Sequence, residues 1–201
     1  MRNPFSGRPP AVHRIVVGLG NPGDGYVATR HNVGFQVAAR LARRARIEFG
    51  TKAAESRIAE GALGGVKFAV ARPQTFMNDS GRAVAKLLDR YRLGPDALLV
   101  ISDDIDLPLG RLRLRESGGS GTHNGMRSIV GQVGEAFARL RLGVGPVDPK
   151  AEIGDLAEYV LSPFAVDERQ LLDEMLQRAT EASEVAVRDG VRMAMDRFNG
   201  G

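Results

Sequence analysis

The sequence has no cysteine and no tryptophan, and aromatic residues make up only 5% of its 201 positions. Without cysteine, disulfides, thiolate zinc sites and cysteine nucleophiles are all excluded. So few rings also exclude base stacking on exposed aromatics as the main way of holding a nucleic acid. No apolar run approaches the roughly 20 residues of a membrane-spanning helix. These absences predict a cytoplasmic protein that is not anchored in a membrane.

Length and composition predict a single folded domain. A chain of 201 residues, 43% of them apolar, can build one full core. The first residues include Arg2, Arg8 and three prolines and lack the apolar centre of a signal peptide. Residues 1–12 are therefore expected to form a flexible tail and residues 13–201 the domain. The 28 basic residues outnumber the 24 acidic ones and the pI is near 9.8, which favours an anionic partner without establishing one.

Hydrophobic periodicity predicts strands that alternate with helices. Apolar runs and period-two patterns predict strands over residues 15–17, 57–60, 66–71, 97–101, 111–115 and 138–144. Period-3.6 patterns predict helices over residues 33–49, 80–91, 123–133 and 166–189, with Gly94 stopping the second. Residues 148–161 fit either a polar loop or a short helix. Some strands are joined by short hairpins, so a mixed sheet covered by helices on both faces is expected.

Polar side chains stand where three predicted strands end and where one helix begins. Asn21 and His31 follow the first strand, Asn78 and Asp103 follow two others, and Asn124 opens a helix. Open α/β sheets gather their sites at such strand ends. If these ends converge, neutral His31 can accept a proton from water while Asp103 holds its other N–H, and the three amides can donate to an oxyanion. The pattern favours hydrolysis of an acyl group by an activated water.

Most of these residues also have a structural interpretation. An isolated Asn or Asp at a strand end is most often a turn former or a helix cap. His123 is equally suited to capping its helix and to lining a cleft, and His13 is expected to be exposed. Met77 and Phe76 fit a core better than a substrate contact.

Two other kinds of site are less well supported. A divalent cation on Asp103, Asp104 and Asp106 is the weaker reading, because side chains this close on a strand alternate between its faces. A serine nucleophile is disfavoured, because Gly118 to Thr122 fails the last position of the G-x-S-x-G pattern.

Gly18 to Gly23 match the dinucleotide-binding pattern G-x-G-x-x-G directly after a strand. That motif also requires a helix to open at the turn and an acidic residue about 20 residues on. Here the turn continues through Asp24 and Gly25, and the downstream region is helical and rich in arginine. A nicotinamide-dependent oxidoreductase is kept as a disfavoured alternative.

Arginine and leucine alternate strictly from Arg111 to Arg115, which predicts a strand with one basic and one apolar face. Basic side chains recur about every 7 Å on that face, a spacing suited to phosphates, and Arg139 and Arg141 repeat the pattern. The pattern indicates binding to the backbone of a structured RNA, with a solvated, salt-bridged face as the alternative. The arginines at positions 40, 43, 44 and 46 are interpreted as the solvent face of a helix.

Three blocks of sequence carry a specific resemblance. VGLGNPGDGYVATRHNVGF, FMNDSGRAV and SDDIDLPLGRLRLRESGGSGTHNGMRSI, in this order and spacing, resemble bacterial-type peptidyl-tRNA hydrolases. The resemblance implies an enzyme that hydrolyses the ester bond between a peptide, or an N-blocked aminoacyl group, and the 3′ end of tRNA, recycling tRNA from aborted translation. It also implies a single three-layer α/β/α domain around a central mixed, mostly parallel sheet, monomeric and without a metal or cofactor.

The resemblance gives roles to individual positions. It implies that His31 is the catalytic base, Asp103 the carboxylate that orients it, and Asn21 a catalytic amide. The substrate-binding positions that it implies are Tyr26, Met77, Asn78, His123 and Asn124. Arg115 and Arg141 match positions that hold tRNA phosphates, and the alternating pattern adds Arg113. The sequence departs from the family at Ser117 and Thr122, where glycines are usual, and at Ser102, where many members have histidine.

Overall fold

The computed structural model describes residues 12–148 and 150–200, which contain one seven-stranded sheet. Its strands are β1 (Arg14–Gly18), β2 (Thr51–Ala53), β3 (Ser56–Leu63), β4 (Val66–Pro73), β5 (Leu98–Pro108), β6 (Leu112–Arg115) and β7 (Ala138–Gly145). They lie in the order β2-β3-β4-β1-β5-β7-β6. The four central strands are mutually parallel, whereas β2, β3 and β6 pair antiparallel with their neighbours.

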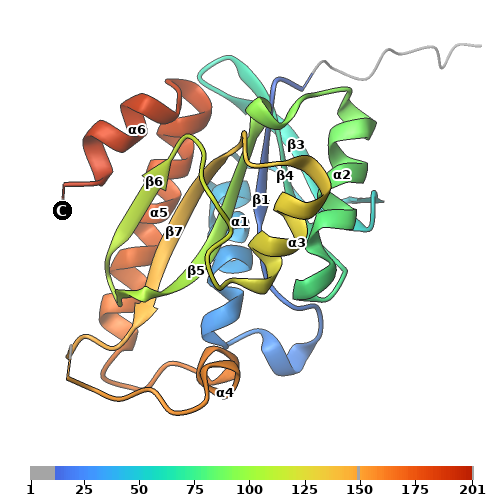
Figure 1. Ribbon diagram of the computed structural model, residues 1–201. Helices are drawn as coiled ribbons and strands as arrows, with labels where there is room; N and C mark the ends of the chain where they lie inside the picture. Colours follow the sequence, from blue (N-terminus) through green and yellow to red (C-terminus); the bar gives the residue numbers. More distant parts are fainter. Residues whose placement is uncertain (1–11, 149, 201) are drawn as a thin grey trace, which may run out of the picture.

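Helices cover both faces of the sheet. They are α1 (Val33–Arg44), α2 (Ser80–Tyr91), α3 (Asn124–Val133), α4 (Leu156–Leu161), α5 (Arg169–Arg188) and α6 (Val191–Phe198). The helices α1 and α5 lie on one face, α2 and α3 on the other, and α4 lies beyond one end of the sheet (Figure 1). The predicted α/β/α architecture with a mixed sheet is confirmed. Within the described residues, no helix is both long and apolar enough to cross a membrane.

Strand β5 is longer than predicted, and the acidic residues lie within it. It runs on to Pro108 because β7 lies beside it beyond the end of β1, so that Asp103 still pairs with Leu142. The register shifts only after Asp104. Asp103 and Asp104 therefore belong to the sheet and point to opposite faces, rather than following the strand in a turn.

Single residues in a left-handed conformation terminate two of the helices. α1 ends at Arg44 rather than near residue 49, since Arg46 has a φ of 55°, and the chain then forms the unpredicted strand β2. α2 ends at Tyr91 as predicted, but the left-handed residue that terminates it is Arg92 and not Gly94.

The C-terminal region forms two helices where one is predicted. Gly190, with a φ of 97°, separates α5 from α6, and α6 then packs against β6. Residues 148–161 contain the short helix α4, which was one of the two alternatives. Val12 is buried in the core, so the folded part begins before the predicted boundary, and the rest of the predicted tail lies outside the described residues.

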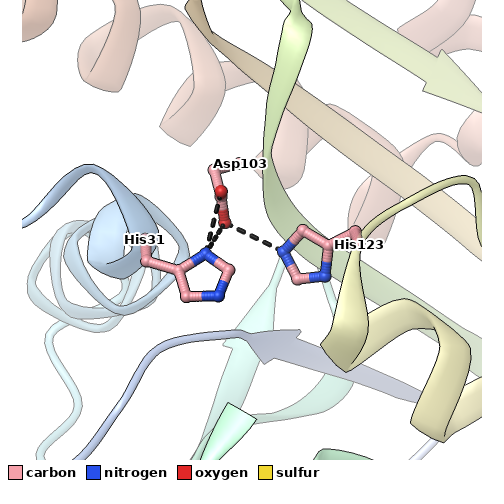
Figure 2. A group of neighbouring side chains, drawn as sticks. All are labelled: His31, Asp103 and His123. Carbon is pink, nitrogen blue, oxygen red and sulfur yellow. Dashed lines mark hydrogen bonds and ion pairs between the residues drawn. The ribbon is translucent and has the colours of Figure 1, made fainter. Parts of the chain in front are cut away.

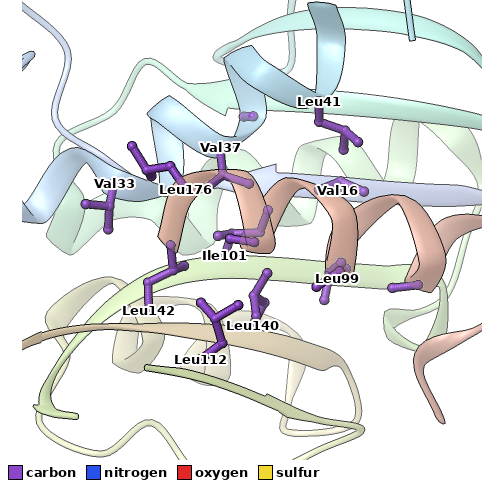
Figure 3. Packing of buried hydrophobic residues seen from close by; sticks show 14 of the residues in the cluster. Val16, Val33, Val37, Leu41, Leu99, Ile101, Leu112, Leu140, Leu142 and Leu176 are labelled. Carbon is purple, nitrogen blue, oxygen red and sulfur yellow. The ribbon is translucent and has the colours of Figure 1, made fainter. Parts of the chain in front are cut away.

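Apolar side chains form a core on each face of the sheet. On one face, Val37 and Leu41 of α1 and Leu176 of α5 pack over Ile101 and Leu140 (Figure 3). The other core lies beneath α2 and α3. Burial of one such side chain is worth about 1.5–3 kcal/mol. The two cores hold the central strands in place from both sides, and this fixes the loops at their carboxyl ends.

Two arginines on the polar face of α1 form ion pairs with α5. Arg40 pairs with Asp173, and Arg44 pairs with Glu184. Exposed pairs of this kind contribute about 0–1 kcal/mol each. At these two positions the interpretation as a solvated helix face is confirmed.

Helix α1 begins in direct contact with the sheet. A Cβ on Gly34 would lie 2.5 Å from the carbonyl oxygen of Ile101 and 2.5 Å from the backbone nitrogen of Leu19. The backbone N–H of Phe35 donates to the carbonyl of Leu19 at 3.0 Å. This contact fixes the start of α1, and with it His31, against the carboxyl ends of β1 and β5.

Replacing Gly34 with alanine is expected to lower the free energy of unfolding by about 2 kcal/mol or more, because the new methyl group would meet backbone atoms of two strands. The matched control is Gly131→Ala in α3, where a Cβ meets nothing within 4 Å. That change should stabilise the protein by about 0.5–1 kcal/mol through helix propensity. Urea unfolding measures both variants, and equal stabilities would show that α1 does not depend on the close approach.

Candidate active site

The polar residues predicted at strand ends come together at one end of the sheet. β1 lies between β4 and β5 and is parallel to both, so their carboxyl ends are neighbours. The chain returns to this end in the 3₁₀ turn η2 (Arg30–Asn32) before α1, and again at the start of α3. The residues brought together are Asn21 after β1, Met77 after β4, Asp103 in β5, His31 in η2 and His123 before α3.

The carboxylate of Asp103 lies between two imidazoles (Figure 2). Nδ1 of His31 is 2.8 Å from Oδ1 and 2.9 Å from Oδ2 of Asp103. Nε2 of His123 is 2.9 Å from Oδ1 of the same carboxylate. The two rings are tilted by 43°, with their centroids 5.0 Å apart. Two histidines that lie 92 residues apart in the chain therefore share one acidic partner.

Asp103 is ionised despite its burial. Its side chain is only 3% exposed, and burial by itself would raise the pKa of the carboxyl group. Charge and hydrogen bonds from His123 and from His31 outweigh that effect and hold the pKa of Asp103 well below its usual range. The carboxylate is therefore a permanent acceptor for both rings at neutral pH.

The hydrogen bonds assign different tautomers to the two histidines. His123 Nδ1 accepts from the backbone N–H of Met126 at 3.2 Å, so the proton of this ring is on Nε2 and points to Asp103. His31 donates Nδ1–H to Asp103, and its Nε2 lies on the side of the ring away from the carboxylate (Figure 2). Among the described residues nothing hydrogen-bonds to that nitrogen. His31 is therefore the ring with a free lone pair.

His123 performs both roles that its position allowed. Its ring caps the N-terminus of α3 and also lines the cavity beside Asp103. Because both of its nitrogens are engaged, His123 supports the carboxylate and does not act as the base.

Asn21 is held by hydrogen bonds on three sides. Its Oδ1 accepts from the backbone N–H of Met77 at 2.8 Å, and its backbone N–H and C=O are bonded to the side chain of Asn32. The side-chain NH₂ of Asn21 is left to donate. Asn32 is a residue that sequence reasoning missed, although it belongs to the Arg-His-Asn triplet that marks the start of α1.

These side chains line a cavity of about 920 Å³, a volume typical of ligand sites. Asn78 and Asn124 stand exposed on its wall. Asn124 Oδ1 accepts from the guanidinium of Arg127 at 3.3 Å, which orients the amide nitrogen away from that contact. Met77 is both buried and in the wall, whereas Phe76 is 59% exposed. The expectation that Phe76 lies in the core is wrong, because Phe76 precedes the 3₁₀ turn η3 (Met77–Asp79), in which Met77 is the buried residue.

The glycine-rich loop over residues 117–122 forms another wall of the cavity. Gly118 and Gly121 have positive φ values of 150° and 56°, which only glycine adopts readily. Ser117 and Thr122 do not require positive φ, so the backbone accommodates them where the family usually has glycine.

Arg139 lies in the cavity wall, but its guanidinium is bonded to the protein and anchors this loop. Its side chain is 2% exposed and donates to the carbonyls of Gly119 at 2.7 Å, Glu135 at 3.1 Å and Phe137 at 3.2 Å. The prediction that Arg139 repeats the phosphate-binding pattern is wrong. Arg139 lies opposite Arg115 on the same face of the sheet, but the glycine-rich loop covers it there, which the period-two spacing cannot predict.

The alternating arginines of β6 have one exposed face, as predicted. Arg113 and Arg115 are exposed, while Leu112 and Leu114 are buried. Arg115 reaches the cavity, but Arg113 is not part of its lining. Arg141 lies in the wall and forms an ion pair with Asp104, so this guanidinium has an internal carboxylate partner.

A further wall of the cavity comes from α4, within the segment 148–161 for which the sequence left a polar loop or a short helix open. Leu156, Val160 and Leu161 line it. Arg30 connects this wall to η2: it pairs with Glu168 at 2.6 Å, and its guanidinium lies 4.5 Å from the ring centre of Tyr159. Apolar and acidic residues are mixed in 152–161 without a helical or strand period, so the sequence did not indicate which of them face the cavity.

Tyr26 and His13 lie away from the cavity. Tyr26, in the 3₁₀ turn η1 (Asp24–Tyr26), is not among the lining residues, and its carbonyl accepts from the hydroxyl of Thr29 at 2.8 Å. His13 is exposed, as expected. Tyr26 as a substrate-binding residue stays a prediction.

His31, Asp103 and His123 also have the donor atoms of a metal site, since their ligating atoms lie within 4.8 Å of one another. In the described arrangement, however, the nitrogens nearest Asp103 donate hydrogen bonds to it. Asp104 and Asp106 are not part of this group, because Asp104 pairs with Arg141. The three side chains fit a hydrogen-bonded group, in which Asp103 accepts from both rings, better than a set of metal ligands.

The glycines of Gly18 to Gly23 serve packing and not a dinucleotide. A Cβ on Gly18 would lie 2.1 Å from the carbonyl oxygen of Gly34, so this glycine allows α1 to approach β1. Two 3₁₀ turns separate the glycine turn from α1, which places a helix N-terminus too late in the chain for a pyrophosphate.

Comparison with known proteins agrees with this geometry. Residues 15–201 match the family model for peptidyl-tRNA hydrolase. The chain is 51% identical over 187 residues to the peptidyl-tRNA hydrolase of Chloroflexus aggregans, covering 92% of this chain and 98% of that protein. It is 50% identical to the peptidyl-tRNA hydrolase of Roseiflexus sp., over 92% and 85% of the two chains.

Solved structures give the same result. A variant of the peptidyl-tRNA hydrolase of Acinetobacter baumannii superimposes with a TM-score of 0.86 at 32% identity, over 94% of this chain and 96% of that one. The peptidyl-tRNA hydrolase of the same organism, at 1.00 Å resolution, gives 0.85 at 34% identity, over 93% and 94%. This chain therefore belongs to the peptidyl-tRNA hydrolase family.

Proposed function

We propose that this protein hydrolyses the ester bond between a peptide, or an N-blocked aminoacyl group, and the 3′ end of tRNA, using a water activated by His31. The observation that carries the proposal is the free Nε2 of His31 in the same cavity as Asn21, on a ring whose other nitrogen is held by an ionised, buried Asp103. Base, orienting carboxylate and oxyanion donor are the three parts that acyl hydrolysis by water requires.

In the first step, a water attacks the ester carbonyl and gives its proton to Nε2 of His31. Asp103 fixes the tautomer that leaves Nε2 unprotonated, and its negative charge stabilises the imidazolium that forms. The carbonyl oxygen becomes an oxyanion, to which the NH₂ of Asn21 donates. Removing one such donor typically costs about 10²–10³-fold in rate.

In the second step, the tetrahedral intermediate collapses and the ester C–O bond breaks. The imidazolium of His31 returns the proton to the departing ribose oxygen, so the products are a free tRNA and a peptide carboxylic acid, which then releases its proton to the solvent. Asp103 carries no proton at any point, which agrees with its low pKa. His123 contributes by keeping Asp103 charged and in place.

The walls of the cavity suggest how the two parts of the substrate are held. Apolar side chains of α4, with Phe76 and Met77, suit the peptide, and the amides of Asn78 and Asn124 suit its backbone groups. Arg115 and Arg141 suit phosphates of the tRNA, and Arg113 lies on the same strand face as Arg115. In this proposal Arg141 exchanges Asp104 for a phosphate.

We further propose that the enzyme acts as a cytoplasmic monomer, with residues 13–201 as one catalytic domain and without a metal or cofactor. The absence of cysteine agrees with a cytoplasmic location. The single continuous sheet of the described residues agrees with one domain. The complete set of hydrogen bonds around Asp103 supports the last.

The change His31→Ala is expected to lower kcat on an N-acetyl-aminoacyl-tRNA by about 10²–10⁴-fold while tRNA still binds, because only the proton acceptor is lost. The matched control is His13→Ala, which removes an exposed histidine and should leave the rate unchanged. Both are assayed by release of the acyl group with EDTA present, and tRNA binding is measured separately by filter retention.

Hydrolysis by His31→Ala at the wild-type rate would refute the assignment of the base. Loss of wild-type activity in EDTA would show that a metal takes part. A second candidate is a non-catalytic RNA-binding protein with the same fold, and binding of tRNA by the wild type without any turnover would favour it over the proposed reaction.

The stability difference between wild type and Asp103→Asn is expected to depend on pH. Because the pKa of Asp103 is lowered in the folded state, its ionised form contributes stability that is complete above the unfolded pKa of about 3.9 and is lost as the pH falls toward the folded value. The wild type should therefore lose stability relative to the variant between about pH 5 and pH 2. Urea unfolding at several pH values measures this, and parallel curves would contradict it.

The change Arg115→Gln is expected to weaken tRNA binding and to reduce the slope of log K against log salt by about 1, because one phosphate contact is lost. Arg90→Gln, at the far end of α2, removes the same charge away from the cavity and is the control. Binding is measured by fluorescence anisotropy at several salt concentrations. An unchanged slope would favour a merely solvated strand face at β6.

A further inference from the structure

A second concavity, of about 460 Å³, lies on the other side of the turn that carries Asn21. Asn21 and Asn32 form part of its wall, and Asn21 also lines the active-site cavity. The remaining walls come from α1 and from the ends of β3 and β4. None of the residues assigned to the reaction, apart from Asn21, belongs to it. The function proposed above leaves this concavity unexplained.

Three cations stand in register on neighbouring strands at this place. Lys52 of β2 is paired with Arg57 of β3, and Arg57 is paired with Arg72 of β4. Side chains of directly paired residues lie on the same face, about 5 Å apart, so like charges opposite one another destabilise a sheet. Arg57 and Arg72 both line the concavity, and Lys52 extends the row toward the sheet edge.

Within residues 12–148 and 150–200, no carboxylate forms an ion pair with these three cations. Asp24 lines the same concavity without pairing with either arginine. Glu55, near them in sequence, is taken by Arg82 and Lys86 on the other side. The row therefore has an excess of positive charge that its own neighbours do not neutralise.

The guanidinium of Arg72 is held in a fixed position. It lies 4.3 Å from the ring centre of Phe49 and 5.8 Å from that of Phe35, both of which line the concavity. Its Nε is buried and has no hydrogen-bond partner among the described residues. Burial, and then the charge of Arg57, lower the pKa of Arg72. A rigid, partly desolvated guanidinium with a second cation beside it is well suited to an oxyanion.

We propose that Arg57 and Arg72, with Lys52 at the rim, bind a phosphate group of the tRNA substrate beside the active site. The inference rests on the proposed function, because it takes the substrate to be a tRNA ester. A phosphate offers several oxygens to two guanidiniums, and a phosphodiester is the anion that every such substrate carries. The wall shared at Asn21 places the concavity next to the point where the 3′ end is cleaved.

The rings of Phe35 and Phe49 give the concavity an apolar floor beside its cations. Proteins that hold single-stranded nucleic acid combine such surfaces with cations that follow the backbone. The concavity is thus expected to bind the unpaired 3′ end of the tRNA and not its base-paired stem. A small phosphate compound would offer the same oxygens as the tRNA phosphate and is the alternative ligand for this site.

The test compares Arg57→Gln with wild type on three substrates that carry the same uncharged N-acetyl-aminoacyl group. The group is attached to adenosine, to the 3′-terminal trinucleotide of tRNA, or to whole tRNA. Arg57→Gln should raise KM about threefold to tenfold for the trinucleotide and for tRNA, leave kcat unchanged, and have no effect on the adenosine ester, which has no phosphate. Lys52→Gln should give a smaller change in the same direction.

The control is Arg90→Gln on α2, which removes an equal charge from the opposite face of the sheet. Arg72 is not mutated, because its packing on Phe49 couples it to folding. The slope of log(kcat/KM) against log salt should fall by about 0.7 for the trinucleotide in Arg57→Gln, the value for one phosphate of a single strand.

The outcomes separate this inference from the proposed function. Equal KM values for Arg57→Gln and Arg90→Gln on all three substrates would overturn the site as part of substrate binding. A thermal shift of the wild type by inorganic phosphate or AMP that Arg57→Gln abolishes, without any change in KM, would overturn the tRNA source in favour of a free phosphate compound. Failure of the wild type to cleave any of the three esters would instead refute the proposed function.

Discussion

The arrangement of the active site depends on one buried carboxylate that accepts hydrogen bonds from two imidazoles. A charge as enclosed as that of Asp103 is costly unless several donors compensate for it, and His31 and His123 are those donors. Each ring is in turn fixed by something else: His123 by the N-terminus of α3, and His31 by the start of α1. The site is therefore as rigid as the helices that end there.

Hydrogen bonds from within the protein also orient the amide side chains. Asn21 and Asn124 each use the side-chain oxygen to accept a hydrogen bond from within the protein. Their NH₂ groups are the parts that face the cavity or the solvent. A cavity lined by donors, beside a base with a free lone pair, favours a ligand that develops negative charge on oxygen. The folding of the loops thus determines the polarity of the cavity.

Sequence reasoning could predict the architecture and the convergence of polar side chains at one end of the sheet, because both follow from local patterns. Strand ends followed by Asn21, Asn78 and Asp103 are visible as the point where apolar runs stop. What could not be predicted depends on neighbours distant in the chain. The extension of β5 past Asp103 requires β7, and the inward orientation of Arg139 requires the glycine-rich loop that it holds. The residues next to Asp103 and Arg139 in the sequence do not indicate that β7 or the glycine-rich loop will lie beside them.

The arginines illustrate why composition is a poor guide to binding. A net charge of +4 indicates little, because the cations are used in different ways. Arg30 and Arg139 face inward and hold loops in place, while Arg40 and Arg44 are paired with α5.

Two groups of arginines face concavities near the proposed reaction centre: Arg115, with Arg141 and its partner Asp104, at the edge of the active-site cavity, and Arg57 with Arg72 beside Asn21. A tRNA that contacts both places would be held on two sides of the scissile ester. Because these cations contact the substrate away from the reacting bond, they would contribute to its affinity and leave the rate of the bound ester unchanged. The local pairing of each guanidinium, and not the total charge, therefore determines where an anionic substrate can lie.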